Sequence, residues 1–443
     1  MELDGAGLTC AQVHQAAYGG ARVTIASTDR ARTAWRAAGE LTGTVYGMTT
    51  GVGANRDVAV SEGGFDLLRS HAGGAGPVVE EERCRAMLVV RLNQLLAGGS
   101  GIDPGVLPVL ADAINDGFTP QVRKYGAIGT GDLTALATTA LCLLGERDWR
   151  GPAGEQPRFP LGSGDALPFL SSGAATLADA AIACHRLAVL LDAGVEVAAL
   201  SFTAVDASAE PLAAAVQEAR PHPGQALTAA RLRGLLAGEL AARVQDPYGF
   251  RAVAQVHGAA VDALGHATRV VETDLNAATE NPLIAESLAW HNGNFHGAQV
   301  ALALDTLRAA VAQAAQLSTA RLAALMNPAY TGLLPFLADR QGASGAMILE
   351  YVAQDALADL RHLATPVTTG TAVISLGTED HASFATQAAR RALECLEPLE
   401  VVLACERVAA TRALHHRRHG GEADPDRPLD TDLDDARRAL SPR

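Results

Sequence analysis

Long segments rich in Ala and Leu fill the second half of the chain, and they restrict its fold more than any other feature. They follow one another at about 174–200, 224–243, 252–276, 298–326, 343–363 and 382–414. Segments of this length match the long helices of a bundle, because an α-helix rises about 1.5 Å per residue. The sequence therefore predicts a mainly α fold built on a long-helix bundle.

The most apolar segment, 174–200, does not have the pattern of a membrane span. Charged and polar side chains interrupt it at Asp179, His185, Arg186, Asp192 and Glu196. A buried bundle helix tolerates that spread, whereas a transmembrane helix does not. The segment 298–325 is apolar on more than one face and needs burial on several sides. We therefore expect no membrane contact, and helices that pack on more than one neighbour.

Residues 1–165 are mixed in character, with short β-like runs at 22–25 and 43–46. The apolar periodicity predicts helices at 80–96, 108–115 and 134–145. The stretch 149–166 is rich in Gly and Pro and is the best candidate boundary. We predict three regions, namely a small mixed N-terminal domain (1–165), the long-helix bundle (166–412) and a charged, mobile tail (413–443).

Charge and cysteine content exclude several classes of function. The net charge is −14, from 35 basic and 49 acidic residues, which argues against a nucleic-acid partner. Six cysteines are scattered without CxxC or zinc-ligand spacing, so we expect no metal site and reduced thiols in a cytoplasmic protein. The first residues have neither the basic nor the apolar region of a signal peptide, and we expect none.

Short polar or Gly-rich loops separate the helical segments, and each loop alone is open to a structural reading. Tyr46 directly precedes the loop GMTTGVG. This tyrosine is either a reactive group or a residue packed in the core. Arg251 lies one turn into a helix that starts near Pro247. An Arg beside a helix N-terminus opposes the helix dipole, so it is expected to serve a bound anion such as a carboxylate. The sequence EDH at 379–381 is either a capping group or part of a site.

Taken in order, the loops resemble one known family. The motifs are VYGMTTGVG, RSHAGGAG, GTGDLTALA, QDPYGFR, QVHG, ENPL, GNFHG and GTEDH. Their order resembles the aromatic amino acid ammonia-lyase and aminomutase family, with histidine ammonia-lyases as the most similar members, from about residue 10 to 412. The resemblance implies the fumarase/aspartase-like bundle with a small mixed N-terminal domain. It also implies a carbon–nitrogen lyase that removes the amine from a histidine-like or aromatic α-amino acid and leaves an α,β-unsaturated acid.

The family builds an electrophile, a methylidene-imidazolone, from an Ala-Ser-Gly tripeptide, and this chain departs from that pattern. The tripeptide position reads Gly129, Thr130 and Gly131. Dehydration of Thr130 would give an ethylidene group, whose extra methyl crowds the carbon to be attacked. Ser172 stands where the family has an assisting Asn. Two readings follow: either the tripeptide cyclises to a substituted group, or the site works without one.

The resemblance also implies roles for individual residues. Tyr46 matches the catalytic base, Arg251 the clamp on the substrate carboxylate, and His71 the position that distinguishes histidine-type members. The implied catalytic residues are Tyr46, Gly129, Thr130, Gly131, Tyr248 and Glu379. The implied substrate-binding residues are His71, Ser172, Gln245, Arg251 and Phe295.

The sequence leaves several activities possible, and the resemblance implies one oligomeric state. The implied partner is a small amino-acid substrate. The alternatives to an ammonia-lyase are a 2,3-aminomutase, an elimination without prosthetic group of the ergothionase kind, and an inactive homologue that serves as a binding subunit. The family further implies a homotetramer, in which Tyr46 and residues 245–251 reach one site from different chains.

Overall fold

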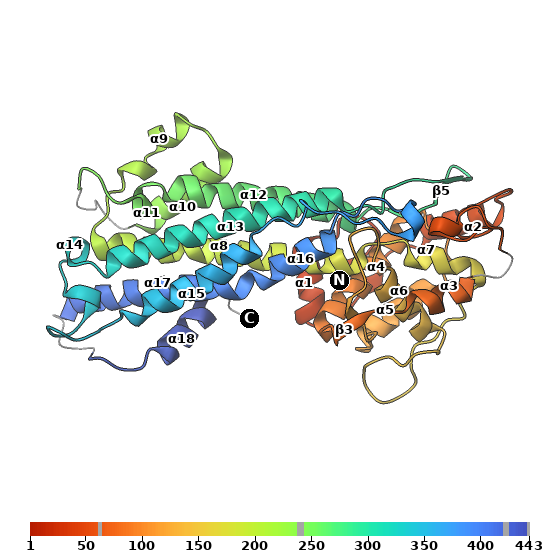
Figure 1. Ribbon diagram of the computed structural model, residues 1–443, viewed down its shortest axis with the longest axis horizontal. Coiled ribbons are helices and arrows are strands. Elements are labelled where there is room, and N and C mark those ends of the chain that lie inside the picture. The colour runs from red at the N-terminus through yellow and green to blue at the C-terminus, as the bar shows by residue number, and fades with distance from the viewer. Residues whose placement is uncertain (61–63, 237–242, 420–424, 441–443) are drawn as a thin grey trace. The chain divides into compact units, whose positions relative to one another are not determined.

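The computed structural model describes residues 1–60, 64–236, 243–419 and 425–440. The chain is mainly helical, and its few strands are short (Figure 1). The α-helices are α1 (Cys10–Tyr18), α2 (Asp29–Gly39), α3 (Gly64–His71), α4 (Glu81–Ala97), α5 (Val106–Asn115), α6 (Leu133–Leu143), α7 (Ala166–Leu170), α8 (Ala174–Val205), α9 (Ala214–Glu218), α10 (Pro223–Leu235), α11 (Tyr248–Arg251), α12 (Val253–Leu275), α13 (Ala298–Leu325), α14 (Pro328–Thr331), α15 (Ile348–Leu363), α16 (Ala385–Glu394), α17 (Leu396–His419) and α18 (Asp430–Leu440).

The strands pair in twos. The parallel pair is β1 (Glu2–Leu3) with β2 (Thr24–Ile25). The antiparallel pairs are β3 (Ala75–Val78) with β4 (Arg123–Tyr125), and β5 (Leu283–Ala285) with β6 (Leu288–Trp290). The run 43–46, predicted as extended, lies in a loop and a turn instead. Gly43 (φ 91°) and Gly47 (φ 68°) flank it, and these left-handed positions do not continue a strand.

The predicted segment 382–414 is two helices, α16 and α17, with a break at Cys395. Pro398 lies in the first turn of α17. A proline there has no N–H for the carbonyl of Glu394, and its ring clashes with that carbonyl, so one helix cannot continue through both. The predicted helix 224–243 is present as α10 to Leu235, and 237–242 lie outside the described residues.

The chain divides into two compact units, and the division differs from the predicted boundary at residue 165. Unit 1 comprises residues 1–185, 268–304 and 366–393, and unit 2 comprises 186–267, 305–365 and 394–443. The Gly- and Pro-rich stretch 149–166 therefore lies within unit 1, where most of 151–155 is exposed. Its composition marks a surface loop. Three of the unit boundaries fall within the long helices α8, α12 and α13, where composition does not change.

Buried polar side chains of α4 explain why unit 1 includes residues from far along the chain. The guanidinium of Arg91 pairs with Glu280 at 3.0 Å, and both side chains are buried. The amide of Asn93 donates to the carbonyl of Leu275 at 2.9 Å, and the amide of Gln94 donates to the carbonyl of Asp274 at 3.0 Å. Buried polar groups require such partners, so these bonds tie α4 to the 274–280 segment.

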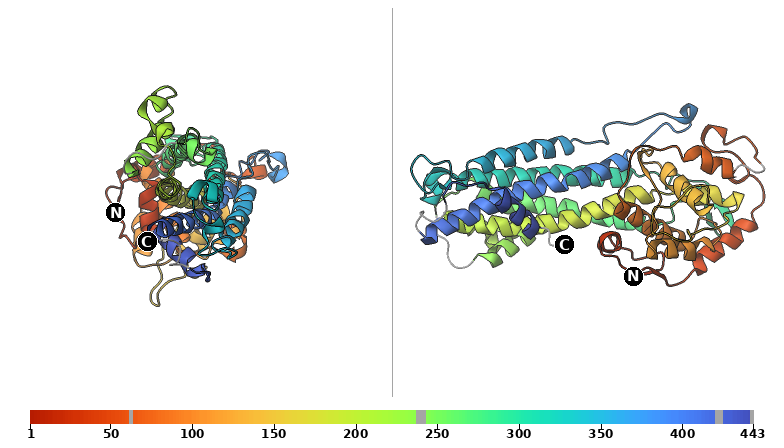
Figure 2. Two further views of the ribbon diagram at one scale, coloured as in Figure 1. Left: turned by 90° about the vertical axis from the view of Figure 1, so that its left-hand side faces the viewer. Right: turned by 90° about the horizontal axis from the view of Figure 1, so that it is seen from below.

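Unit 2 consists of long helices that run alongside one another (Figures 1 and 2). A buried carboxylate joins three of them. Glu406 of α17 receives Nε and Nη2 of Arg321 from α13 at 2.6 and 2.8 Å. It also accepts hydrogen bonds from the hydroxyls of Ser201 in α8 and Ser318 in α13. The same Arg321 donates to the carbonyl of Gly249 in α11 at 3.2 Å, so the network also fixes that short helix.

The C-terminal tail, predicted to be mobile, is helical over most of its described length. Helix α17 extends to His419, and α18 packs against it. Leu429, Ala436 and Leu440 are buried, and their spacing gives α18 an apolar stripe despite its many charges. Residues 420–424 and 441–443 of the predicted tail lie outside the described residues.

Among the described residues, one stretch, Ser163–Val205, is long and apolar enough to cross a membrane. It includes α8, and 61% of its apolar window is buried inside the protein. Burial of this kind is typical of a core helix, which has the same length and composition as a spanning helix.

Candidate functional site

A cleft of about 1050 Å³ lies in unit 1, and all the residues that line it belong to that unit. Six of the predicted site residues line it although they come from separate segments of the chain, namely Tyr46, His71, Thr130, Gly131, Phe295 and Glu379. The cleft is large enough for an amino acid, since pockets for small ligands usually span about 300–1,000 Å³.

Tyr46 is half-buried, and both its backbone N–H and its hydroxyl form hydrogen bonds. Its backbone N–H donates to Nε2 of His291 at 3.2 Å. Its hydroxyl oxygen accepts the N–H of Gly53 at 2.8 Å. Burial raises the pKa of Tyr46 above its ordinary value of 10, and the charge of Glu379 adds to the rise, while the Gly53 N–H and Arg56 oppose it. The hydroxyl is therefore fixed between groups that favour its neutral form and groups that favour the phenolate.

His71, at the end of α3, presents one ring nitrogen to the site. Its Nδ1 lies 2.9 Å from the carbonyl oxygen of Leu67. A carbonyl only accepts, so Nδ1 carries the hydrogen of this bond, and Nε2 of the neutral ring is left as an acceptor. His71 lines the cleft and can therefore receive a hydrogen bond from a ligand there.

The loop before α16 carries the acidic side of the cleft. Glu379 and His381 line it, and Nδ1 of His381 lies 3.0 Å from Nε2 of His296. Hydrogen bonds join this loop to the loop after Tyr46. Ala54 N–H donates to Oγ of Ser375 at 2.9 Å, and Nη1 of Arg56 donates to Oγ1 of Thr378 at 2.8 Å.

The tripeptide Gly129–Gly131 has its first carbonyl held by two donors. The oxygen of Gly129 accepts the N–H of Gly297 at 3.0 Å and the hydroxyl of Ser383 at 2.7 Å. Gly129 has φ 85°, and a Cβ there would lie 2.2 Å from Oγ of Ser383 and 2.5 Å from the backbone nitrogen of Ala385. This arrangement therefore requires glycine where the family has alanine. Ser383 is thus a site residue that sequence reasoning did not name.

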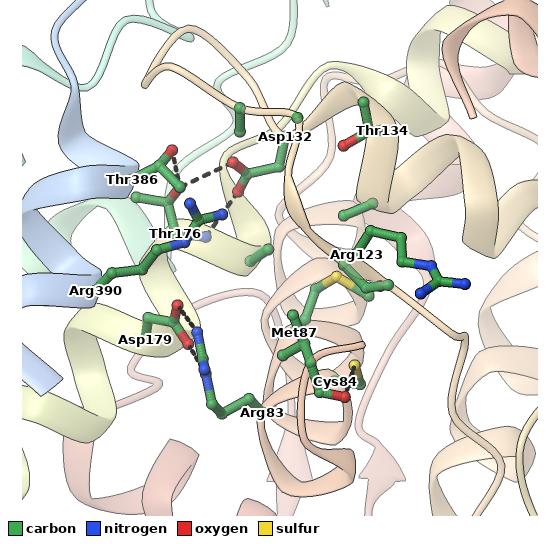
Figure 3. A pocket seen from close by; sticks show the side chains of 16 residues that line it. Arg83, Cys84, Met87, Arg123, Asp132, Thr134, Thr176, Asp179, Thr386 and Arg390 are labelled. Atoms are coloured by element: carbon green, nitrogen blue, oxygen red, sulfur yellow. Dashed lines mark hydrogen bonds and ion pairs between the residues drawn. The ribbon is translucent and has the colours of Figure 1, made fainter. Parts of the chain in front are cut away.

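Asp132, directly after the tripeptide, anchors it to α8 through a buried network (Figure 3). Its carboxylate accepts the backbone N–H of Thr176 at 2.7 Å and the hydroxyl of Thr176 at 2.8 Å. The hydroxyls of Thr176 and Thr386 are 2.8 Å apart, which extends the network to α16. Burial raises the pKa of Asp132 to about 6. Figure 3 also shows the ion pair of Arg83 with Asp179, one turn further along α8.

Ser172, predicted to bind substrate, is fully buried and is not among the residues that line the cleft. Its hydroxyl donates to Oε1 of Gln94 at 2.6 Å and accepts the N–H of Ala174 at 3.0 Å, at the start of α8. The short side chain is thus engaged in packing α8 on α4. Its neighbour Ser171 does line the cleft.

Gln245, Tyr248 and Arg251 belong to unit 2 and are not among the lining residues. Tyr248 is 70% exposed, and the Arg251 guanidinium lies 4.6 Å from the centre of its ring. The predicted carboxylate clamp is therefore on the surface of its own unit.

Arg56, His291 and Arg390 are among the lining residues that were missed from the sequence. His291 lies four residues before Phe295, in the sequence HNGNFHG, and extending that motif toward the N-terminus would have found it. Arg390 lies within α16, and no local pattern distinguishes it from other charged residues on that helix. Among the residues that the structure describes, no group of His, Cys, Asp or Glu has the arrangement of a metal site.

Comparison with known proteins places the chain in a family. The sequence profile described as aromatic amino acid lyase matches residues 8–437. The chain belongs to the aromatic amino acid lyase family. Histidine ammonia-lyase of Streptomyces coelicolor is 36% identical over 445 residues, covering 93% of this chain and 87% of that protein.

Several solved structures share the fold. Tyrosine aminomutase from Streptomyces globisporus has a TM-score of 0.89 and 28% identity, and the match covers 99% of this chain and 96% of that one. Ergothionase from Treponema denticola also has a TM-score of 0.89, at 24% identity, over 99% and 98% of the two chains. The predicted family and mainly helical fold are confirmed, and the protein is a carbon–nitrogen lyase of the ammonia-lyase type.

Proposed function

We propose that this aromatic amino acid lyase eliminates ammonia from histidine, or from an α-amino acid with a similar ring, and releases the α,β-unsaturated acid. The observation that carries the proposal is the convergence of Tyr46, His71 and Glu379 on one cleft that also contains Thr130. Histidine ammonia-lyase relatives at 36% identity support the same substrate class.

Two acceptors in the cleft favour a ring with N–H donors. Nε2 of His71 is free to accept because Nδ1 is engaged with Leu67, and the carboxylate of Glu379 accepts as well. A protonated imidazole ring offers an N–H group to each acceptor and a neutral one offers a single N–H group, whereas a phenyl ring offers none. A phenyl ring would displace water from these two acceptors without replacing its hydrogen bonds, so the pair would select histidine over phenylalanine.

Tyr46 would take the β-proton and Arg251 would hold the substrate carboxylate. Because burial and Glu379 raise the pKa of Tyr46, a cationic substrate bound between them would favour the phenolate. Arg251 belongs to unit 2, whereas the cleft belongs entirely to unit 1. The family resemblance implies a homotetramer in which a second chain supplies Arg251, and we propose the same arrangement for this protein.

The residues around Gly129 fit the family's self-formed prosthetic group. The N–H of Gly297 and the hydroxyl of Ser383 would polarise the Gly129 carbonyl for attack by the Gly131 nitrogen. Thr130 faces the cleft, which has room for the additional methyl group. When formed, the imidazolone supplies an electrophilic carbon that turns the amine into a better leaving group.

A second candidate function is elimination without that group, from a substrate with a better leaving group. Ser172 favours it, because its hydroxyl is engaged by Gln94 and Ala174 and supplies no amide to assist an electrophile. The intact mass separates the two candidates. Loss of two waters relative to the sequence mass, abolished in Thr130→Ala, supports the first, and an unaltered mass supports the second.

Turnover tests the proposal directly. Purified protein is incubated with histidine, phenylalanine or tyrosine, and release of ammonia and of the unsaturated acid is measured. Tyr46→Phe should reduce kcat by about 10²–10⁴-fold while leaving the fold intact. Tyr351→Phe, at an exposed position of α15, is the matched control. Full turnover in Tyr46→Phe would exclude Tyr46 as the base.

A further inference from the structure

The loop of residues 53–56 carries both groups that favour the charged form of Tyr46. The N–H of Gly53 donates to the Tyr46 hydroxyl oxygen at 2.8 Å, and Arg56 contributes a positive charge. A hydrogen bond donated to a phenol oxygen and a nearby cation both stabilise a phenolate. The ability of Tyr46 to act as a base therefore depends on where this loop is held.

A second loop, residues 374–379, holds the first through two hydroxyl groups. Oγ of Ser375 accepts the N–H of Ala54 at 2.9 Å, and Oγ1 of Thr378 accepts Nη1 of Arg56 at 2.8 Å. The approach is close, since a Cβ on Gly53 would lie 2.4 Å from Oγ of Ser375. One contact is made by Ala54, the residue after Gly53, and the other by Arg56 itself. The second loop therefore holds both groups that act on Tyr46.

The backbone of the second loop keeps a defined and unfavourable shape. Ser375 (φ 52°) and Leu376 (φ 55°) are both left-handed, a conformation that non-glycine residues adopt at an energetic cost. The N–H of Ile374 donates to the carbonyl of Glu379 at 2.9 Å and closes the loop. Leu376 is 96% exposed, so burial of its side chain does not explain this shape. The left-handed turn instead directs the Ser375 hydroxyl at Ala54.

We propose that Ser375 and Thr378 are positioning residues that hold the 53–56 loop so that the Gly53 N–H stays on the Tyr46 hydroxyl and the charge of Arg56 stays near it. The inference rests on the proposed role of Tyr46 as the base. Neither residue needs to touch substrate, because each acts through the loop. The other titratable groups around the cleft are Tyr125, His71, His291, His296, His381, Asp57, Glu379, Asp380 and Arg390.

The test compares variants that remove a hydroxyl with one that keeps it. Ser375→Ala and Thr378→Val should lower kcat/KM about tenfold at neutral pH and shift its rise with pH upward by about one unit. Thr378→Ser should behave as wild type, because it retains the acceptor. Thr371→Val is the matched control, since Oγ1 of Thr371 accepts the N–H of Ala382 across the two ends of this loop, and no hydrogen bond described for it reaches residues 53–56. A purely structural role would lower activity equally at every pH, and that result would overturn the proposal.

A second measurement does not depend on turnover. Ultraviolet titration of the phenolate, taken as the difference between each variant and the same variant carrying Tyr46→Phe, isolates Tyr46 among the six tyrosines. An upward shift in Ser375→Ala and Thr378→Val supports the proposal even if no amino acid is turned over. Unshifted titration, with turnover intact, overturns the positioning role and leaves the lyase assignment standing.

Discussion

Replacing Glu406 with Gln tests whether one buried carboxylate holds unit 2 together. Its side chain is fully buried, and Arg321 is nearly so, with Nε and Nη2 at 2.6 and 2.8 Å. The variant keeps the volume but removes the negative charge, so the Arg321 guanidinium stays buried without a counter-charge. Breaking a buried pair in this way costs about 3–5 kcal/mol, compared with about 1 kcal/mol for a neutral hydrogen bond.

The assay is urea unfolding followed by circular dichroism, at one protein concentration so that any subunit association contributes equally. Glu406→Gln should unfold at a clearly lower urea concentration than wild type. The control is Glu146→Gln, which breaks a similarly double-bonded pair with Arg69 on the surface of unit 1 and should have a much smaller effect. Equal midpoints for the two variants would refute the reasoning.

A double variant separates charge burial from packing. Arg321→Met with Glu406→Leu removes both charges, so stability should recover in part relative to Glu406→Gln. It also removes the hydrogen bond from Arg321 to the carbonyl of Gly249, which fixes α11. A stable double variant with a raised KM would therefore assign this pair a role in orienting Tyr248 and Arg251.

Two further variants address binding and pH. Arg251→Lys keeps the charge but loses the planar fork, so KM should rise about tenfold or more with little change in kcat, and unchanged kinetics would remove Arg251 from the site. Burial raises the folded-state pKa of Asp132 from 3.8 to about 6, so its contribution to stability is present below pH ~4 and is lost as pH rises through about 6. Thermal unfolding should show that wild type loses about 3 kcal/mol more than Asp132→Asn between pH 4 and 7, and parallel pH profiles would contradict this.

The long helices and the main cleft residues were predictable from the sequence. Continuous apolar segments determine where α8, α12 and α13 run, and ordered motifs mark the loops of Tyr46 and Glu379. Periodicity identifies an apolar face but not its partner, so the inclusion of residues 268–304 and 366–393 in unit 1 could not be foreseen.

The contacts of single side chains were harder to predict from the sequence than the positions of helices. Ser172 occupies a motif position, yet its hydroxyl turns to Gln94, 78 residues away in the sequence. Ser383 was passed over because no motif distinguishes a serine after EDHA, and its role depends on its contact with Gly129. Contacts of this kind depend on tertiary packing, which a single sequence does not encode locally.

The assembly of unit 1 from three distant stretches has a consequence for how the protein is made. Ala54 and Ser375 are 321 positions apart, and Gly129 and Ser383 are 254 apart. A ribosome must therefore synthesise the chain beyond residue 390 before the cleft can close around Tyr46. Closing such long loops is slow, because the chain entropy is lost before the contacts form. The α4 surface that receives residues 274–280 stays exposed until that segment has been synthesised, so nascent chains are expected to need protection from aggregation during synthesis.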